Sequence, residues 1–357
     1  MLIIGIILAA VAVGAGSFFA YSAYRLNQIP EMTFEDMLSY MTGNNDEAVI
    51  TVGMINNGEI SYTVYGKDGI ILPQTEHIYE IGSMTKTFTA SLLFKAVGEG
   101  KINLRDSIDK YLDLPEKEYY PTIQRLITHT SGYKSHYPET PMVSNFFAGR
   151  NSFCGISEET LIKRIGKTNL KDRDYKFAYS NFGISVVGAV LSKVYEKDYT
   201  LLVNEFAQEE LGLKQTMVKG GSGDLTGYWD WAENDAYLPA GALTSTIEDM
   251  LKYAQMQMEG LPEYLSGTHG PLAEINATSA AYAKMNIRMD SIGAAWMIDS
   301  ENNIVWHNGG TGDFNCYLGF DPDRQIAVVV LSNLAPNYRI PATVLGVKLL
   351  SDLQIDQ

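Results

Sequence analysis

The chain of 357 residues is long enough to bury a large core, and its 46 % hydrophobic and 19 % charged residues are typical of a globular protein. Its net charge of −15 argues against nucleic acid and against an anionic membrane surface as partners. Two cysteines, Cys154 and Cys316, are too few for a disulfide framework, and whether they pair is left open. The five histidines are scattered without a metal-binding spacing, so we expect no metal and no other cofactor.

The first segment, Leu2 to Tyr24, is almost entirely apolar and is followed by its first charge at Arg25. Such a run is long enough to cross a bilayer as a helix. A cleaved signal peptide is the alternative, because small residues near Ala15 and Ala23 offer cleavage sites. A signal peptide usually begins with basic residues, which this chain lacks, so we favour an uncleaved anchor over residues 1–28. We therefore predict a membrane-attached domain outside the cytoplasm, which would be secreted if the segment is cleaved.

Hydrophobic periodicity then predicts a short helix, a β-hairpin with an Asn-Gly turn, a short strand, a mostly helical middle, four strands and a last helix. In chain order these elements span Thr33 to Met41, Ala48 to Ile55, Glu59 to Tyr65, Ile78 to Ile81, Thr122 to Ile127, Glu158 to Ile165, Ser180 to Val194, Thr244 to Met258, Gly293 to Ile298, Ile304 to His307, Asn315 to Phe320, Ile326 to Ser332 and Pro341 to Leu353. Strands at both ends of the chain therefore flank a helical middle at about 101–258. The economical packing is an α/β sandwich, in which helices cover one antiparallel sheet built from both ends and a helical subdomain is inserted.

The stretch Ile81 to Phe88 places Lys86 three residues after Ser83. Residues three apart on a helix have Cβ atoms about 5–6 Å apart, so a lysine whose pKa is lowered by burial can take the serine proton. The same spacing begins at Ser107 and Ser131, but only Ser83 precedes a long apolar helical pattern that would bury the pair. We interpret Ser83 as a nucleophile, and the alternative is that it only caps the helix.

A second group, Tyr179-Ser180-Asn181, opens the next apolar helical pattern. A tyrosine beside a cationic lysine can have its pKa lowered and then donate or accept protons. The amide of Asn181 could hold a substrate. Of the 22 tyrosines, only Tyr179 is followed by asparagine two residues later. The alternatives are a half-buried core tyrosine and a helix-capping asparagine.

The third group, His307-Asn308-Gly309-Gly310, extends directly from a predicted strand. Glycines at a strand edge let a substrate backbone approach closely. The N–H of Gly310 could be an oxyanion donor beside that of Ser83. The alternative is a Gly-rich turn with an incidental histidine.

Taken in order, S-x-x-K at Ser83, Y-x-N at Tyr179 and H-x-G at His307 resemble the serine hydrolase family of class C β-lactamases, D-Ala-D-Ala carboxypeptidases and related esterases, which is penicillin-binding-protein-like. The resemblance covers residues 32–357 and implies the α/β sandwich with an all-helical subdomain. Two flanking stretches also look like loops of that family, Leu126 to Gly132 and Pro239 to Ser245.

The resemblance also implies an acyl-enzyme mechanism. Ser83 would attack the substrate carbonyl while Lys86 and Tyr179 move the protons. Asn181 would hold the acyl amide, and the N–H groups of Ser83 and Gly310 would bind the oxyanion. Water activated by Tyr179 would then deacylate the enzyme. The catalytic residues implied are Ser83, Lys86 and Tyr179, and the substrate-binding residues are Asn181, His307, Gly309 and Gly310.

His307 stands where classical β-lactamases and carboxypeptidases carry the lysine of K-T-G. Histidine is mostly neutral near pH 7, so it holds a substrate carboxylate less well than lysine does. We expect activity on carboxylate-bearing substrates to rise as His307 protonates between about pH 8 and 5.

The leading interpretation is an extracytoplasmic serine hydrolase that cleaves a D-configured peptide, amide or ester, from a small molecule or from the cell wall. The alternatives are a non-catalytic or slowly turning-over β-lactam-binding sensor and a true β-lactamase.

Overall fold

The computed structural model describes residues 28–218 and 222–355. The predicted anchor therefore lies outside the described residues, apart from its last residue, Gln28. Among the residues that are described, no helix combines the length and the apolar character needed to span a bilayer.

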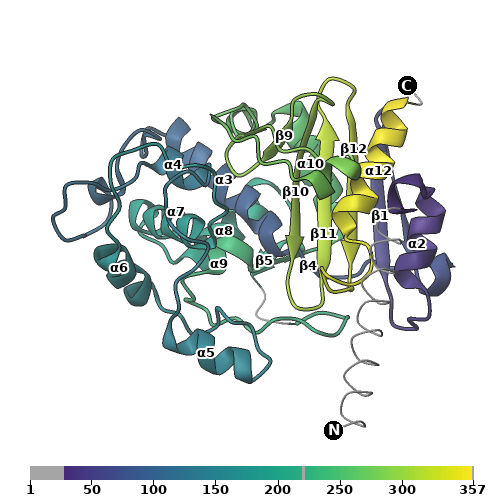
Figure 1. Ribbon diagram of the computed structural model, residues 1–357, viewed down its shortest axis with the longest axis horizontal. Helices are drawn as coiled ribbons and strands as arrows, with labels where there is room; N and C mark the ends of the chain where they lie inside the picture. The colour runs from purple at the N-terminus through teal and green to yellow at the C-terminus, as the bar shows by residue number, and fades with distance from the viewer. Residues whose placement is uncertain (1–27, 219–221, 356–357) are drawn as a thin grey trace, which may run out of the picture.

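A nine-stranded antiparallel sheet runs in the order β3-β2-β1-β12-β11-β10-β9-β8-β7 (Figure 1). Its strands are β1 (Ile50–Asn56), β2 (Glu59–Tyr65), β3 (Ile71–Leu72), β7 (Ala273–Glu274), β8 (Ser291–Ile292), β9 (Met297–Asp299), β10 (Ile304–Gly310), β11 (Asn315–Asp321) and β12 (Ile326–Ser332). The first and last long strands pair directly, with Ile50 opposite Ser332. The predicted antiparallel sheet built from both ends of the chain is therefore confirmed.

The β1–β2 hairpin has the predicted turn. Asn56 pairs with Glu59, which leaves Asn57 and Gly58 as a two-residue loop with φ of 52° and 78°. Asparagine and glycine are the residues that best tolerate positive φ, and turns of this kind match the twist of the paired strands.

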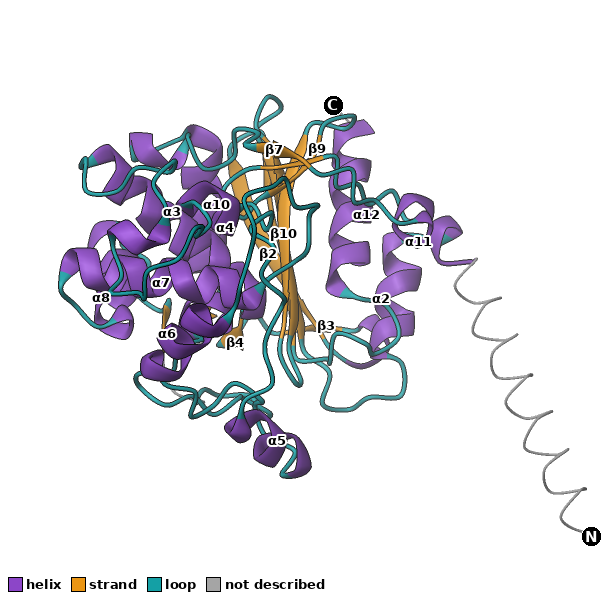
Figure 2. Cartoon of the chain, turned by 60° about the vertical axis from the view of Figure 1, so that its left-hand side comes forward, coloured by secondary structure: helices purple, strands orange, loops and turns teal. Residues whose placement is uncertain are grey.

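Helices cover both faces of the sheet (Figure 2). Helices α2 (Phe34–Thr42) and α12 (Ala342–Ile355) lie on one face, and α10 (Ile247–Glu259) packs on the other against β1, β11 and β12. Every residue of β11 and β12 is buried as a result, and the sequence of β12 is accordingly apolar from Ile326 to Leu331. Helix α10 lies in the stretch at about 101–258 that we predicted as the helical subdomain, but it packs against the sheet.

The other helices of the middle are α4 (Ile123–Ile127), α5 (Thr140–Phe147), α6 (Glu158–Lys167), α7 (Asn181–Tyr195), α8 (Tyr199–Glu205) and α9 (Leu238–Gly241), and a further short helix, α11 (Ala280–Lys284), precedes β8. Three of them, α7, α8 and α9, pack against α3 (Thr85–Gly98), which lies between them and the sheet, while α4 and α6 pack on α7 (Figure 1). Contacts of α3 with α7 and α9 bury its side chains on nearly every face. The helix is therefore held rigidly at the junction of the two parts.

Two predicted elements are corrected. Residues Leu243–Ser245 form a strand, β6, because their backbone pairs with β4 (Tyr79–Glu80) and β5 (Met217–Val218) in a second, three-stranded sheet. Helix α10 begins only afterwards, with the Thr246 side chain capping it. Of the single strand predicted at Gly293 to Ile298, only Met297 and Ile298 are strand, in β9. Residues 293–296 instead form the tight turn that joins β8 to β9, in which Ala295 has a φ of 62°.

Candidate active site

Ser83 lies in a single 3₁₀ turn, Gly82–Met84, between strand β4 and helix α3. The turn presses against the end of β10: a Cβ on Gly82 would lie 2.5 Å from the backbone nitrogen of Gly310. On Gly309 it would lie 1.9 Å from the carbonyl oxygen of Ile81. Only glycine permits these approaches, so the glycines of both motifs bring the turn carrying Ser83 against the sheet edge.

Lys86 is fully buried on the first turn of α3. Its Nζ donates hydrogen bonds to Ser83 Oγ at 2.8 Å and to the carbonyl oxygen of Ala240 at 2.6 Å. Among the described residues it belongs to no ion pair, and burial alone holds its pKa well below the usual value for lysine. A neutral amine in contact with a serine hydroxyl can accept its proton. The hydroxyl of Ser83 caps neither its own turn nor α3.

Tyr179 is partly buried directly before α7, where Ser180 caps the helix by accepting a hydrogen bond from Gly183 N. Lys86 Nζ lies 4.9 Å from the centre of its ring. Burial raises the pKa of Tyr179, and a hydrogen bond with Ser83 offsets only part of that rise. The sequence argument that a cationic lysine lowers this pKa is therefore wrong, because the lysine is itself buried. At neutral pH, Tyr179 is a protonated phenol and can donate a proton.

His129 positions Tyr179, and the sequence analysis gave it no role. Its carbonyl oxygen accepts from Ala178 N at 2.9 Å, and its Nδ1 accepts from Ser180 N at 3.2 Å. The two ring centres of His129 and Tyr179 are 4.5 Å apart. Both His129 and Ala240 belong to the flanking stretches noted in the sequence, which was the only signal that could have found them.

His307 lies on β10 with only 1 % of its surface exposed, and its Nδ1–H donates to the carbonyl oxygen of Asn308 at 2.5 Å. Burial, assisted by Lys86, lowers the pKa of His307 to about 3. The imidazole is therefore neutral throughout the range from pH 5 to pH 8. This neutrality argues against the expectation that protonation of His307 between pH 8 and pH 5 promotes activity on carboxylate-bearing substrates.

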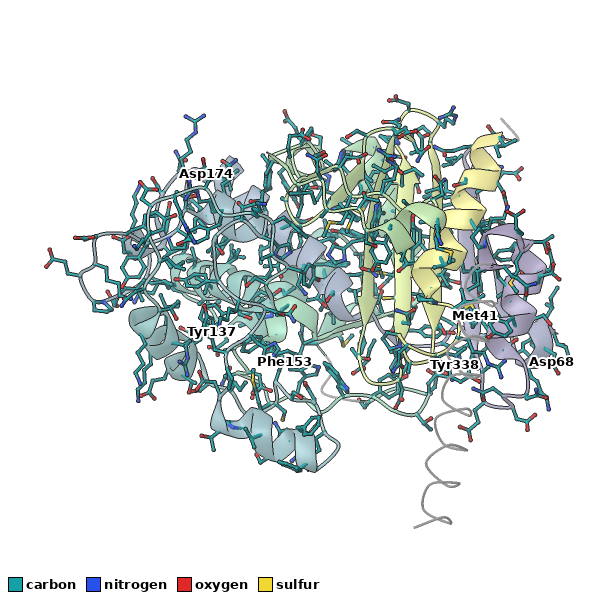
Figure 3. The ribbon with its side chains drawn as sticks, viewed as in Figure 1. Met41, Asp68, Tyr137, Phe153, Asp174 and Tyr338 are labelled. Carbon is teal, nitrogen blue, oxygen red and sulfur yellow. The ribbon has the colours of Figure 1, made fainter. Side chains whose placement is uncertain are left out.

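Two hollows meet at Ser83 and Gly310, and both residues line each of them. The narrow cavity has a volume of about 120 Å³, and Phe153 on its wall is labelled in Figure 3. The wide groove has a volume of about 350 Å³. The other residues of the narrow cavity are Asn181, Trp229, Trp231, Tyr237, Ala240 and Gly241.

The structure thus brings together Ser83, Lys86 and Tyr179 and places the predicted substrate-binding residues around them. Asn181 and Tyr179 lie on different sides: Asn181 lines the narrow cavity, whereas Tyr179 and Gly309 line the wide groove. The amide oxygen of Asn181 is buried and, among the described residues, has no hydrogen-bond partner. It is therefore available to a substrate.

The described part of the chain contains no group of three histidine, cysteine or acidic side chains that could hold a metal ion. The two cysteines, whose pairing the sequence left open, are both free thiols.

A family model described as Beta-lactamase matches residues 38–347. The curated Protein flp of Staphylococcus aureus (strain MW2) is 23 % identical over 286 residues, which cover 73 % of this chain and 53 % of that protein. A beta-lactamase of Pseudomonas fluorescens is 24 % identical over 361 residues, covering 86 % and 93 %. The chain thus spans about half the length of the Staphylococcus relatives that it matches.

Solved structures share the fold. The Beta-lactamase/D-alanine Carboxypeptidase of Yersinia pestis superposes with a TM-score of 0.70 at 19 % identity, over 94 % of this chain and 99 % of that chain. The octameric penicillin-binding protein homologue of Pyrococcus abyssi gives 0.69 at 20 % identity, over 95 % and 77 %.

Proposed function

The chain belongs to the beta-lactamase family of serine hydrolases, and on this basis we propose that it cleaves an ester, amide or peptide through an acyl-enzyme on Ser83. The observation that carries the proposal is the 2.8 Å hydrogen bond to the Ser83 hydroxyl from the buried Lys86, which forms no ion pair with any residue that the structure describes. Burying a lysine without a carboxylate is costly, and such a cost is typical of a functional site. An acyl-enzyme of this kind serves two reaction types, that of a D-alanyl carboxypeptidase, whose leaving group carries a carboxylate, and that of an esterase, whose leaving group is an alcohol.

Acylation follows from the positions of three side chains. Ser83 Oγ attacks the substrate carbonyl carbon as its proton passes to neutral Lys86. The N–H groups of Ser83 and Gly310 stabilise the oxyanion, because the Gly82 turn holds them side by side. Tyr179 then gives its proton to the leaving group and recovers one from Lys86. Proton transfer in this direction requires a neutral lysine and a protonated tyrosine, the states that burial favours.

Deacylation repeats the steps with water as the nucleophile. Lys86, neutral again after it has returned a proton to Tyr179, takes a proton from the water molecule that attacks the acyl-enzyme, either directly or through the Tyr179 hydroxyl. Ser83 then leaves as the alkoxide and is reprotonated by Lys86. The acyl group departs as a carboxylic acid, so atoms and protons balance over one turnover.

The location we propose is the outer face of a membrane, with a cell-wall or small-molecule acyl substrate within reach. The support is the uncharged apolar run from Leu2 to Tyr24 in the sequence. Cell fractionation should place the full-length chain in the membrane fraction, accessible to protease added from outside. A chain that remains in the soluble cytoplasmic fraction would contradict this location.

The test compares the full-length chain with Ser83→Ala and with Ser107→Ala as a matched control. Release of nitrophenol from a short-chain ester should be lost in Ser83→Ala and kept in Ser107→Ala. Equal rates in all three proteins would show that Ser83 is not the nucleophile.

Intact mass after brief exposure to a penicillin sorts the alternatives. A lasting adduct on Ser83 without ester turnover would favour the sensor, whereas rapid formation and loss of the adduct would favour a β-lactamase. Ester turnover without a penicillin adduct supports the esterase.

A further inference from the structure

The proton donor distinguishes the two sides of the site. The group that protonates the leaving atom must lie within hydrogen-bond reach of it. Tyr179 lines the wide groove and not the narrow cavity, while Asn181 lines the narrow cavity and not the groove. The leaving group therefore occupies the wide groove, and the acyl group occupies the narrow cavity. This assignment rests on the proposed function.

The narrow cavity limits the size of the acyl group. Its volume of about 120 Å³ is somewhat smaller than the roughly 150 Å³ of an engineered cavity that holds benzene. Four aromatic side chains form its wall, so it cannot enlarge without moving bulky rings: Phe153, Trp229, Trp231 and Tyr237. An acyl group of up to about six non-hydrogen atoms fits there.

The wide groove presents an apolar surface. Its volume of about 350 Å³ lies within the range of about 300–1,000 Å³ that is usual for ligand sites. Two amide side chains line it, and both are bonded to protein. Asn315 Nδ2 donates to Gly309 O and its Oδ1 accepts from Ala342 N, while Asn308 Nδ2 donates to Thr343 Oγ1. The side chains that form the apolar walls are Phe177, Tyr282, Met289, Met297, Trp306 and Pro336.

The groove also lacks a charge that would attract a carboxylate. Of the described residues, no lysine, arginine or acidic residue lines it. Neighbouring His307 is neutral, and the Lys86 amine is buried and bonded to Ser83 and Ala240. The net charge of −15 further repels anions. A carboxylate moved from water into such a groove would lose hydration without gaining a cationic partner.

We propose that the preferred substrates are esters of short acyl groups with an apolar, uncharged leaving alcohol, which binds in the wide groove. In acylation the bond between Ser83 Oγ and the acyl carbon forms, the ester C–O bond breaks, and the alcohol oxygen takes the proton of Tyr179. A substrate with a carboxylate on the leaving side, as in a peptide ending in a free carboxyl group, is disfavoured.

Two acetyl esters test the proposal on the full-length chain. One has an uncharged nitrophenol as leaving group and the other a nitrophenol that carries a carboxylate. Both have the same acyl group, so the narrow cavity contributes equally to each rate. For each ester, kcat/KM is divided by the rate constant of that ester's hydrolysis by hydroxide. We expect this quotient to be at least about tenfold lower for the carboxylated ester than for the uncharged one. A ratio below tenfold, or a preference for the carboxylated ester, overturns the proposal.

A charge added to the groove should reverse the effect. Tyr282 on α11 is 40 % exposed, so it can be replaced without disturbing the core. Tyr282→Arg should raise the relative kcat/KM of the carboxylated ester at least about fivefold over Tyr282→Gln, a replacement without charge, and added salt should reduce the gain. If the kcat/KM of the carboxylated ester relative to the uncharged ester is the same in Tyr282→Arg and Tyr282→Gln, the leaving group binds elsewhere and the assignment is wrong.

The two proposals fail differently. If the wild-type chain hydrolyses neither ester faster than Ser83→Ala does, both the proposed function and the groove assignment are wrong. If hydrolysis depends on Ser83 but shows no discrimination against the carboxylate, only the groove assignment is wrong.

Discussion

Two regions of the molecule carry the same S-x-x-K spacing in opposite environments. Lys86 is fully buried and bonded to Ser83 at 2.8 Å. The Lys110 side chain is 63 % exposed, and its Nζ pairs with Asp106 at 2.5 Å rather than with Ser107. Burial lowers the pKa of Lys86, whereas the hydrogen bond with Asp106 raises the pKa of Lys110.

The serines differ in the same way. Ser107 Oγ donates to the carboxylate of Asp109 and to the carbonyl oxygen of Tyr120, so its proton is already committed. Ser83 Oγ instead accepts from a neutral amine and borders two open hollows. Spacing alone therefore makes no nucleophile. A buried amine without a carboxylate partner is required, because only that amine is a free base near pH 7.

The largest expected difference between the two regions is in kcat/KM when the lysine amine of each region is removed. Lys86→Met should lower kcat/KM for a nitrophenyl ester about 10³-fold, because general-base catalysis is typically worth 10²–10⁴-fold. Lys110→Met should leave it within about twofold. Steady-state kinetics of the two variants measure this difference, and similar losses in both would remove the distinction between the two regions.

Each of the two regions also contains a tyrosine hydroxyl near its serine and lysine. Tyr179→Phe should lower kcat about 10²-fold with little change in KM, because the phenol acts on the leaving group rather than in binding. Tyr111→Phe is the control, since that hydroxyl donates to Asp106. A loss confined to KM in Tyr179→Phe would argue against a proton donor.

Stability should depend on pH through Lys86. Its pKa is lower in the folded state than its unfolded value near 10.5, so between the two values only the unfolded state binds the proton. Folding stability attributable to this residue therefore rises with pH, by at most about 1.4 kcal/mol per pH unit. Lys86→Met should be more stable than wild type at pH 7, with an advantage that shrinks toward pH 10. Urea denaturation at several pH values measures it.

Lys110→Met is the control for that series, because the pKa of Lys110 is raised on folding and any effect has the opposite sign. A constant difference between wild type and Lys86→Met from pH 7 to pH 10 would mean that Lys86 is charged when folded.

The smallest expected effect is on the pH dependence of KM, and it concerns His307, which like Lys86 is buried. With a pKa of about 3 it stays neutral, so the KM for the carboxylated nitrophenyl ester should be flat between pH 5 and pH 8. A KM that falls several-fold toward pH 5 in wild type but not in His307→Gln would show that the imidazole titrates.

Local patterns accounted for much of the fold. Alternation and an Asn-Gly turn identified the first hairpin, and the short helix predicted from Thr33 forms as α2, where the Thr33 side chain accepts from Asp36 N. The strand at Leu243–Ser245 could not be recognised, because its partners at Tyr79–Glu80 and Met217–Val218 are distant in sequence. Three residues are too few to show a period that could be told from the start of a helix.

The sequence by itself determined which groups the site contains, because S-x-x-K, Y-x-N and H-x-G are local patterns of reactive side chains. Tertiary structure alone decided their protonation states. The pKa values of Lys86, Tyr179 and His307 shift through burial by elements from distant parts of the chain, and each shift favours the neutral form. Desolvation depends on the atoms that surround a group, whereas spacing records only the distance along the chain.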